Sequence, residues 1–454
     1  MTPQITFHGA TDTVTGSRYL VEVDRARLLI DCGLFQGPKK LRNRNWDPPG
    51  FDPASLDAVI LTHAHIDHTG YLPRLCSAGF RGRIFCTDGT RDLLKILLPD
   101  SGHLQEEEAR LANRKSYSRH QPALPLYTEA DAEACLDQLS PVSYYDTFVP
   151  APGVSASFTR AGHVVGSGCL RLALGQVALT FSGDVGRPVD PVMKPPDPLS
   201  ATDYLVVEST YGDRRHPTGD ISDELARLVN ATIERRGVVV IPAFAVGRAQ
   251  HLLHVLADLK AKHRIPSIPV YLDSPMAIDA TRLFHNHKAD HGLTDAACDL
   301  MCKLPKYTRT REESMAIDRL TDPMIVISAS GMATGGRILH HLKRFLPDPR
   351  NTILLVGYQS AGTRGRTLVD GIKELKIHGE YVAVGAQVAQ VQGLSAHADY
   401  REMIDWLSAS KLAPRRVFVT HGEPSAADAF RRRLVEELGW NVVVPSLGET
   451  QVLE

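Results

Sequence analysis

Short apolar runs broken by Gly and Pro dominate the first 200 residues. Each run is only four or five residues long and rich in Val, Ile, Leu or Phe, which is typical of β-strands in a sheet. A helix is expected after Thr69, and another within residues 100–114, where an acidic centre lies among helix-forming residues. The expected strands are residues 27–30, 58–61, 155–159, 177–181 and 204–207.

From about residue 209 helical stretches alternate with apolar strands. This alternation predicts a parallel α/β domain. After residue 372 the short β-rich pattern returns. We therefore expect a β-rich domain in two parts, residues 1–208 and 373–454, interrupted by an insertion over residues 209–372. The helices expected in the insertion are 223–236, 247–260 and 337–345, and its strands are 238–242, 269–272, 324–328 and 352–356. The strands expected after it are 381–384, 387–391, 416–420 and 441–444.

The distribution of charge adds to this division. The formal net charge of the chain is −1, which excludes a uniformly basic nucleic-acid coat. Residues 209–370 carry 22 Lys and Arg against 17 Asp and Glu, a net charge of +5, which leaves −6 on the rest. This asymmetry would suit an anionic substrate lying between two parts of the protein. The first residues do not resemble a signal peptide, and no apolar run approaches the ~18 residues of a membrane helix, so we expect a cytoplasmic protein without a membrane partner.

The strongest chemical signal is the segment Thr62-His63-Ala64-His65-Ile66-Asp67-His68. Four metal-capable side chains lie within six positions, directly after an expected strand. Imidazole and carboxylate groups are good ligands for zinc and similar cations. On a regular strand, His63 and His65 would lie on one face with their Cα atoms about 6.6 Å apart, and in a loop they can converge further. Asp67 and His68 then point elsewhere, which indicates a second metal ion.

Further ligands are expected where other strands end. Asp31, His163, Asp184 and His421 each follow an apolar run closely. A single His or Asp in such a place is usually structural. If the strands present their carboxyl ends at one edge of a β-sandwich, however, these side chains converge on one cleft with the segment from His63 to His68.

These motifs resemble those of the metallo-β-lactamase superfamily, whose signature is the HxHxDH loop. The chain is similar, over essentially its whole length, to the β-CASP branch of nucleases, through Glu208 in VVEST, His397 in LSAHAD and His421 in VTHGE. The most similar group is the nuclease subunit of the cleavage and polyadenylation specificity factor and its prokaryotic relatives. The resemblance implies an α/β fold, in which an αββα sandwich is interrupted by an α/β insertion with a mainly parallel sheet.

The resemblance also implies roles for individual residues. One zinc ion would be held by His63, His65, His163 and Asp184. A second would be held by Asp67, His68, His421 and the bridging Asp184. Mn²⁺ accepts the same ligand types.

Other roles that the resemblance implies concern orientation and proton transfer. Asp31 would orient the metal site from outside the ligand shell. His397 would donate a proton to the leaving 3′-oxygen, with Glu208 holding it charged and oriented. A core or capping role for His397 and a simple salt bridge for Glu208 are the alternatives.

A Gly/Ser-rich segment in the insertion is a candidate for phosphate binding. Residues 328–337 (SASGMATGGR) join an expected strand to an expected helix, and such a turn offers backbone N–H groups to an anion. Residues 357–360 (GYQS) follow another strand, and a basic run with one aromatic residue, Tyr307, covers residues 303–311. Tight turns and solvated basic side chains are the alternatives. The candidate phosphate contacts are Ser330, Gly331, Thr334, Arg337, Gln359 and Arg364.

Four functions are considered. The first is a zinc-dependent ribonuclease that cuts RNA internally, with 5′-exonuclease action left open. A DNA repair nuclease of the same branch is disfavoured, since RNA-acting members have His at the position of His421. The roughly 160-residue insertion and the Glu208–His397 pair argue against a small-molecule hydrolase. A non-catalytic RNA-binding scaffold is disfavoured because every ligand position is filled. The oligomeric state is not predicted.

Overall fold

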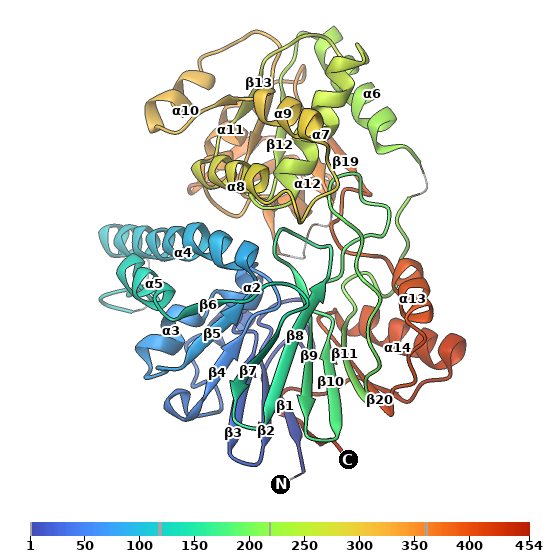
Figure 1. Ribbon diagram of the computed structural model, residues 1–454. Coiled ribbons are helices and arrows are strands. Elements are labelled where there is room, and N and C mark those ends of the chain that lie inside the picture. Colours follow the sequence, from blue (N-terminus) through green and yellow to red (C-terminus); the bar gives the residue numbers. More distant parts are fainter. Residues whose placement is uncertain (1, 117–119, 218, 358, 360–361) are drawn as a thin grey trace. The chain divides into compact units, whose positions relative to one another are not determined.

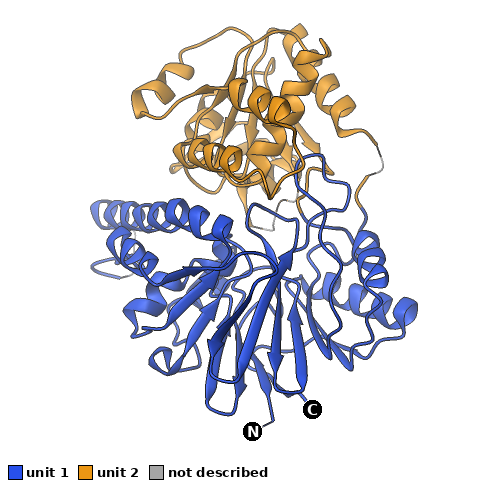
Figure 2. Ribbon diagram, viewed as in Figure 1, with its two compact units in different colours: residues 1–215, 397–454 blue, residues 216–396 orange. Residues whose placement is uncertain are grey.

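The computed structural model describes residues 2–116, 120–217, 219–357, 359 and 362–454. The chain divides into two compact units, which Figure 2 shows in different colours. The first unit consists of Met1–Arg215 together with His397–Glu454, and the second unit is His216–Ala396.

The first unit is built on two sheets of seven strands each (Figure 1). A core of apolar side chains lies between them, including Phe7, Phe158 and Phe418. The first sheet has the order β22 (Thr450–Val452), β1 (Gln4–Phe7), β2 (Tyr19–Val23), β3 (Ala26–Ile30), β4 (Ala58–Ile60), β5 (Arg83–Cys86), β6 (Leu139–Pro141). The second has the order β21 (Val442–Val443), β20 (Arg416–Thr420), β11 (Tyr204–Glu208), β10 (Val177–Phe181), β9 (Gly168–Leu174), β8 (Val154–Arg160), β7 (Thr147–Ala151).

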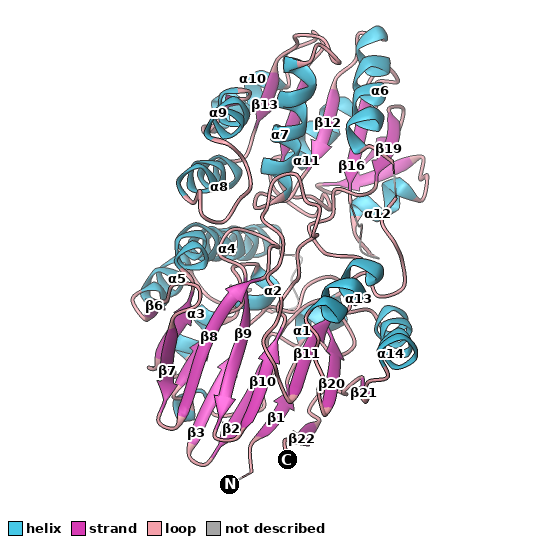
Figure 3. Cartoon of the chain, turned by 45° about the vertical axis from the view of Figure 1, so that its right-hand side comes forward, coloured by secondary structure: helices cyan, strands magenta, loops and turns pink. Residues whose placement is uncertain are grey.

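Helices cover the outer faces of these sheets. Side chains of α13 (Tyr400–Ala409) and α14 (Pro424–Leu438) pack in one cluster with those of β11 and β20, and Figure 3 shows these helices beside the two strands. This alternation of layers confirms the expected αββα sandwich. The helices of the unit are α1 (Lys39–Asn43), α2 (Ile66–Thr69), α3 (Leu72–Ser77), α4 (Asp88–Lys115), α5 (Glu129–Leu136), α13 (Tyr400–Ala409) and α14 (Pro424–Leu438), with a 3₁₀ turn at Pro53–Ser55.

Strand direction brings the predicted ligands to one edge of the sandwich. In the first sheet β3 pairs with β4 in parallel, and in the second β10, β11 and β20 are parallel to one another. Two polar residues that follow these strands turn the chain with a left-handed backbone, Asp31 at φ 56° and His421 at φ 51°. This conformation is uncommon for residues with a Cβ, and backbone strain of this kind tends to cluster at functional sites.

The second unit contains a parallel sheet with helices between its strands, which confirms the expected α/β insertion. Side chains of α11 and α12 pack on one face of this sheet. The strand order is β14 (Lys306–Tyr307), β13 (Val270–Leu272), β15 (Ile325–Ser328), β12 (Val239–Pro242), β16 (Thr352–Val356), β19 (Gln387–Val391). The remaining elements are α6 (Ile221–Glu234), α7 (Arg248–Ala261), α8 (Pro275–Asn286), α9 (Asp295–Lys303), α10 (Arg311–Ile317), α11 (Ile338–Phe345), α12 (Arg364–Val369), β17 (Glu374–Ile377) and β18 (Glu380–Ala383).

The division between the units differs in detail from the boundaries expected at residues 209 and 372. Residues 209–215 lie in the first unit, and residues 373–396 lie in the second. The reason for the second difference is β19, which pairs along its whole length with β16 and so extends the parallel sheet. Among the residues that the structure describes, no helix combines the length and the apolar character needed to cross a membrane.

Candidate metal centre

Three histidines and one carboxylate converge at the edge where the strands end. His63 and His65 lie in the loop between β4 and α2, His163 follows β8, and Asp184 follows β10. His65 Nδ1 lies 3.1 Å from both His63 Nε2 and His163 Nε2. Asp184 Oδ2 lies 3.4 Å from His63 Nε2 and 3.7 Å from His163 Nε2. These four side chains form one group whose ligand atoms are all close together.

The spacing of these atoms fits a zinc ion. Ligands bonded to zinc at about 2.1 Å in a tetrahedron are about 3.4 Å from one another. The separations of 3.1–3.7 Å bracket that value. The donor set of three imidazole nitrogens and one carboxylate oxygen is also a common zinc set. The structure therefore supports a metal site at the residues of the HxHxDH loop.

A second group lies next to the first and shares Asp184 with it. His421 Nε2 lies 3.2 Å from His68 Nε2 and 3.4 Å from Asp67 Oδ2. The other oxygen of Asp184, Oδ1, lies 3.3 Å from His68 Nε2 and 3.4 Å from His421 Nδ1. Asp184 thus presents one oxygen to each group, which is the arrangement that a bridging carboxylate requires. The structure brings together all seven predicted metal ligands.

Burial favours the metal-binding protonation state of the first group. Desolvation lowers the pKa of His63 and of His163, and it lowers the pKa of His65 to about 3, assisted by the neighbouring His63. The pKa of Asp184 lies well below its usual value, since nearby histidines, His421 first, outweigh its burial. Neutral imidazoles beside an ionised carboxylate are the forms that coordinate metals. Asp184 Oδ1 forms no hydrogen bond among the described residues, and it lies at ion-pair distances from His68 Nε2 and His421 Nδ1, as expected of a ligand atom.

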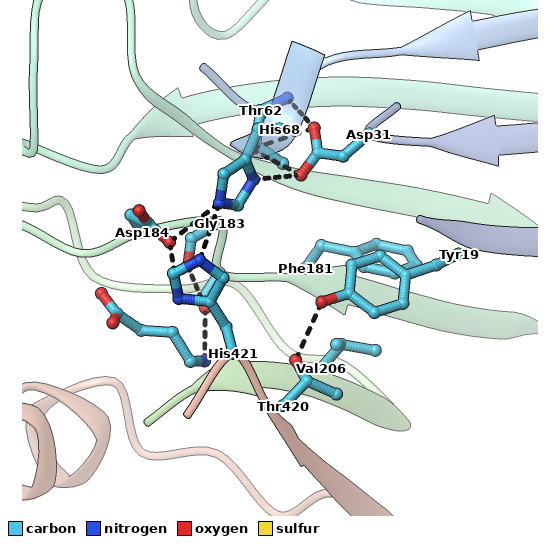
Figure 4. A pocket seen from close by; sticks show the side chains of 12 residues that line it. Tyr19, Asp31, Thr62, His68, Phe181, Gly183, Asp184, Val206, Thr420 and His421 are labelled. Atoms are coloured by element: carbon cyan, nitrogen blue, oxygen red, sulfur yellow. Dashed lines mark hydrogen bonds and ion pairs between the residues drawn. The ribbon is translucent and has the colours of Figure 1, made fainter. Parts of the chain in front are cut away.

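Asp31 orients His68 from outside the ligand group. Its Oδ2 lies 2.7 Å from His68 Nδ1, and its Oδ1 accepts a hydrogen bond from the Thr62 N–H at 2.8 Å. Figure 4 shows His68 between Asp31 and Asp184, with Tyr19 and Phe181 on the far side of the pocket. Burial lowers the pKa of His68, but Asp184 and Asp31 outweigh it and raise the pKa well above its usual value. The Asp31 contact directs Nε2 of His68 toward the candidate metal position.

Buried Glu208 and half-buried His397 form a pair beside the metal ligands. The Nδ1 atom of His397 lies 3.1 Å and 3.2 Å from the two oxygens of Glu208. Glu208 Oε1 also accepts the Val185 N–H at 2.6 Å. Burial lowers the pKa of His397, but Glu208 and then Asp184 overcome this and raise the pKa to about 9. His397 is therefore held protonated at neutral pH, next to the candidate metal centre.

Thr210 is a residue of the site that the sequence did not single out. Its hydroxyl donates to Glu208 Oε2 at 2.5 Å and lies 3.1 Å from His421 Nδ1. The same side chain thus contacts both the Glu208–His397 pair and a predicted metal ligand. Its position two residues after Glu208 in the VVEST motif is the one sequence signal that could have identified it.

The candidate phosphate contacts lie in the second unit and are mostly engaged within it. Arg337 donates to Asp273 and to two backbone carbonyls, and Arg364 donates to the carbonyls of Lys376, Ala333 and Thr334. Both guanidinium groups are therefore hydrogen-bonded within the second unit and are not simply solvated. Their direct contact with phosphate stays a prediction.

The other phosphate candidates lie in or against the loop of residues 330–336. Ser330 Oγ lies 3.0 Å from Thr334 Oγ1 and accepts its N–H, and buried Gln359 donates to the Gly331 carbonyl. Tyr307 lies in β14 and donates to the Cys302 carbonyl. Tyr358 and Ser360 lie outside the described residues.

Three family models match the sequence. Residues 12–213 match the metallo-beta-lactamase superfamily, residues 249–368 the Beta-Casp domain, and residues 381–445 the Zn-dependent metallo-hydrolase RNA specificity domain.

Curated proteins and a solved structure match as well. Ribonuclease TTHA0252 of Thermus thermophilus is 37% identical over 423 residues, which cover 91% of this chain and 92% of that protein. Transcription termination factor FttA of Methanocaldococcus jannaschii is 31% identical over 94% of this chain and 69% of its own length. A crystal structure of a protein of unknown function from Enterococcus faecalis V583 superimposes with a TM-score of 0.58 at 14% identity, covering 100% of both chains, which indicates a shared fold.

Proposed function

We propose, from the premise that this chain belongs to the β-CASP branch of the metallo-β-lactamase superfamily, that it is a zinc-dependent ribonuclease hydrolysing phosphodiester bonds in RNA. The observation that carries the proposal is the pair of adjacent ligand groups sharing Asp184. Paired cations with a common carboxylate are characteristic of enzymes that cleave phosphoesters. The matches to Ribonuclease TTHA0252 and to the RNA specificity domain favour RNA as the substrate.

The seven clustered side chains would hold two zinc ions. His63, His65 and His163 would bind one, Asp67, His68 and His421 the other, and Asp184 would bridge them. When bound, zinc supplies an activated water at neutral pH and neutralises the charge that builds up on the phosphate. Asp31 keeps the ring of His68 in the orientation that coordination requires.

His397 would supply the proton that the leaving group needs. Hydrolysis forms a bond between phosphorus and a water oxygen and breaks the bond to the 3′-oxygen, which must then be protonated. Because Nδ1 of His397 faces Glu208, the proton for transfer is on Nε2. Glu208 is itself fixed by Val185 and Thr210, so the imidazolium is both charged and oriented for this step.

The second unit would contribute phosphate contacts through the loop of residues 330–336. Ser330 and Thr334 offer hydroxyl groups, and the glycines offer backbone N–H groups to an anion. Gln359 supports this loop from its buried position. We further propose that cleavage is endonucleolytic, with 5′-exonuclease action as a second activity to be tested, and that the enzyme acts in cytoplasmic RNA processing or degradation.

The test is to incubate the purified zinc-loaded protein with RNA of known sequence, labelled at its 5′ end in one reaction and at its 3′ end in another. We expect discrete fragments from internal cleavage, loss of activity in His397→Ala, and slower or no cleavage of a DNA strand of the same sequence. Mononucleotides released from the 5′ end would indicate the exonuclease mode. Preferential cleavage of DNA, or RNA binding without cleavage, would contradict the proposal in favour of a DNA repair nuclease or a non-catalytic scaffold.

A further inference from the structure

The second unit buries a carboxylate, Asp273, that meets four side-chain donors. Asp273 directly follows β13 and is fully buried. Its Oδ1 accepts hydrogen bonds from Thr308 Oγ1 and Arg337 Nη1, both at 2.7 Å. Its Oδ2 accepts from Ser314 Oγ and His341 Nε2, both at 2.6 Å. These four donors come from two stretches of the sequence, residues 308–314 and 337–341, so the buried carboxylate ties both stretches to the end of β13.

His341 extends this network to α10. It lies on α11 and is fully buried, and its Nδ1 lies 2.7 Å from Asp318 Oδ1. Because both ring nitrogens face carboxylates, the ring carries a proton on each and is a cation. Buried His341 is thus paired with both Asp273 and Asp318, and half-buried Arg337 is paired with Asp273.

Arg337 connects Asp273 to the two segments that the sequence suggested for RNA binding. It ends the SASGMATGGR segment of residues 328–337. Besides Asp273, its guanidinium contacts the carbonyl of Thr308 at 3.2 Å and that of Arg309 at 2.6 Å. Both carbonyls belong to the basic run of residues 303–311. One side chain therefore holds the Gly/Ser-rich loop and the basic run to the same carboxylate.

The loop of residues 330–336 has backbone N–H groups that are available to an anion. Among the residues that the structure describes, the N–H groups of Gly335 and Gly336 donate no hydrogen bond. The Cβ that a larger residue would add at Gly335 meets no atom within 4 Å, so this part of the loop is open to a ligand. Arg364 holds the other side of the loop through the carbonyls of Ala333 and Thr334.

We propose that Asp273 is a positioning residue for RNA, which acts through Arg337 to hold the loop of residues 330–336 and the basic run of residues 303–311 in the arrangement that the phosphates of one strand require. The inference rests on the proposed ribonuclease function. It assigns to Arg337 a role behind the binding surface in place of a direct phosphate contact. The guanidinium of Arg337 contacts one carboxylate and two carbonyls through two nitrogens of a rigid plane, whereas the ammonium group of a lysine donates from a single nitrogen at the end of a flexible chain.

The decisive variant is Arg337→Lys, which keeps the charge but loses the fork. Arg350→Lys is the matched control, because Arg350 also pairs with an aspartate, Asp348, but at an exposed turn of the same unit. Thr308→Val is a milder, isosteric second variant that removes one hydrogen bond to Asp273 and keeps both ion pairs. Three quantities are measured for each protein: the Kd for a fluorescein-labelled RNA, the kcat and KM for RNA cleavage, and the hydrolysis rate of bis(p-nitrophenyl) phosphate.

We expect Arg337→Lys to raise the Kd and the KM for RNA about tenfold or more, with the rate on bis(p-nitrophenyl) phosphate within about twofold of wild type. Thr308→Val should give a smaller rise in the same direction, and Arg350→Lys should give none. An unchanged Kd in a folded Arg337→Lys protein would overturn the inference, as would an equal loss on the small substrate. The Kd for RNA is measured independently of cleavage. A wild-type protein that binds RNA but does not cut it would therefore contradict the ribonuclease proposal and leave the role of Asp273 and Arg337 in binding unaffected.

Discussion

Each unit buries a cluster of histidine and aspartate side chains, but the polar atoms of the two clusters are paired in different ways. In the second unit, each oxygen of Asp273 meets two donors, and each nitrogen of His341 meets a carboxylate. In the first unit, the ring nitrogens of His63 and His163 both face the same nitrogen of His65 at 3.1 Å. Asp184 Oδ1 forms no hydrogen bond among the described residues, although His68 Nε2 and His421 Nδ1 lie 3.3 Å and 3.4 Å from it.

This difference distinguishes a cluster that stabilises the fold from a cluster that is suited to binding a cation. A buried network in which every donor meets an acceptor specifies a fold. Lone pairs that converge on one another in a buried site repel, and such an arrangement persists in a protein when a cation binds among them. The cluster of the first unit therefore indicates a metal centre, while the cluster of the second unit indicates a scaffold.

The largest expected effect is that of Asp184→Asn. The amide removes the charge of Asp184 and replaces one of its two oxygens, each of which faces one ligand group, so the metal ions are held more weakly and RNA cleavage falls by about 10³-fold or more. Metal content by mass spectrometry and initial rates on RNA provide the measurement. Asp318→Asn, an equivalent change in the second cluster, should leave the metal content unchanged. Two ions retained by Asp184→Asn with near wild-type activity would contradict the assignment.

His397→Ala should leave the metal content intact and lower kcat by about 10²–10⁴-fold, the usual contribution of a general acid. The wild-type rate should fall as the pH rises through about 9, because the pKa of His397 is raised to about 9 and only its protonated form can donate. This alkaline decline should disappear in the variant. A kcat within about twofold of wild type would rule out the proton-donor role.

His341 should make the second unit less stable at alkaline pH. Burial lowers its pKa, but Asp273 and Asp318 outweigh burial and raise the pKa from 6.5 to about 9. A raised pKa stabilises the fold fully below pH 6.5, and this stabilisation is lost as the pH rises through about 9. The shift corresponds to about 3 kcal/mol. Amide hydrogen exchange of α11 and β15 is measured at pH 6 and pH 10. Wild type should lose protection at pH 10, whereas His341→Gln should show little pH-dependent loss. Equal losses in both proteins would contradict the prediction.

The smallest expected effect is that of Thr210→Val. The isosteric change removes a hydroxyl that touches both Glu208 and His421, and loss of such a hydrogen bond costs about 1 kcal/mol, or roughly fivefold in rate. Thr210→Ser keeps the hydroxyl and should retain most of the activity. Measured kcat values for the two variants test this, and equal losses would show that the methyl group, not the hydroxyl, matters.

The fold could be predicted well where strands are short and apolar. The expected bounds of residues 177–181, 352–356, 387–391 and 416–420 coincide with strands of the structure, because such runs leave few alternatives to burial in a sheet. Helices α8, α9 and α10 were missed, although each begins after a Ser or Thr that caps its first turn. These helices are short and lack a long apolar stripe, so only the capping residue indicates where they begin.

The candidate sites likewise contain residues that local sequence patterns identify and contacts that only the tertiary structure shows. The ligand group could be assembled from the sequence because a dense motif and strand ends define it. The pairing of Arg337 with Asp273, 64 residues earlier in the chain, depends on tertiary structure that no local pattern records. An Arg beside a Gly-rich loop suggests a phosphate contact, and only the buried carboxylate behind it indicates a bracing role.

The central claim is that side chains from distant parts of the chain hold two metal ions around Asp184. The most direct measurement is anomalous X-ray scattering at the zinc edge from crystals of the zinc-loaded protein. The account predicts two peaks, one among His63, His65 and His163 and the other among Asp67, His68 and His421, with Asp184 between them. Absence of both peaks at saturating zinc, in crystals where these side chains are ordered, would contradict it.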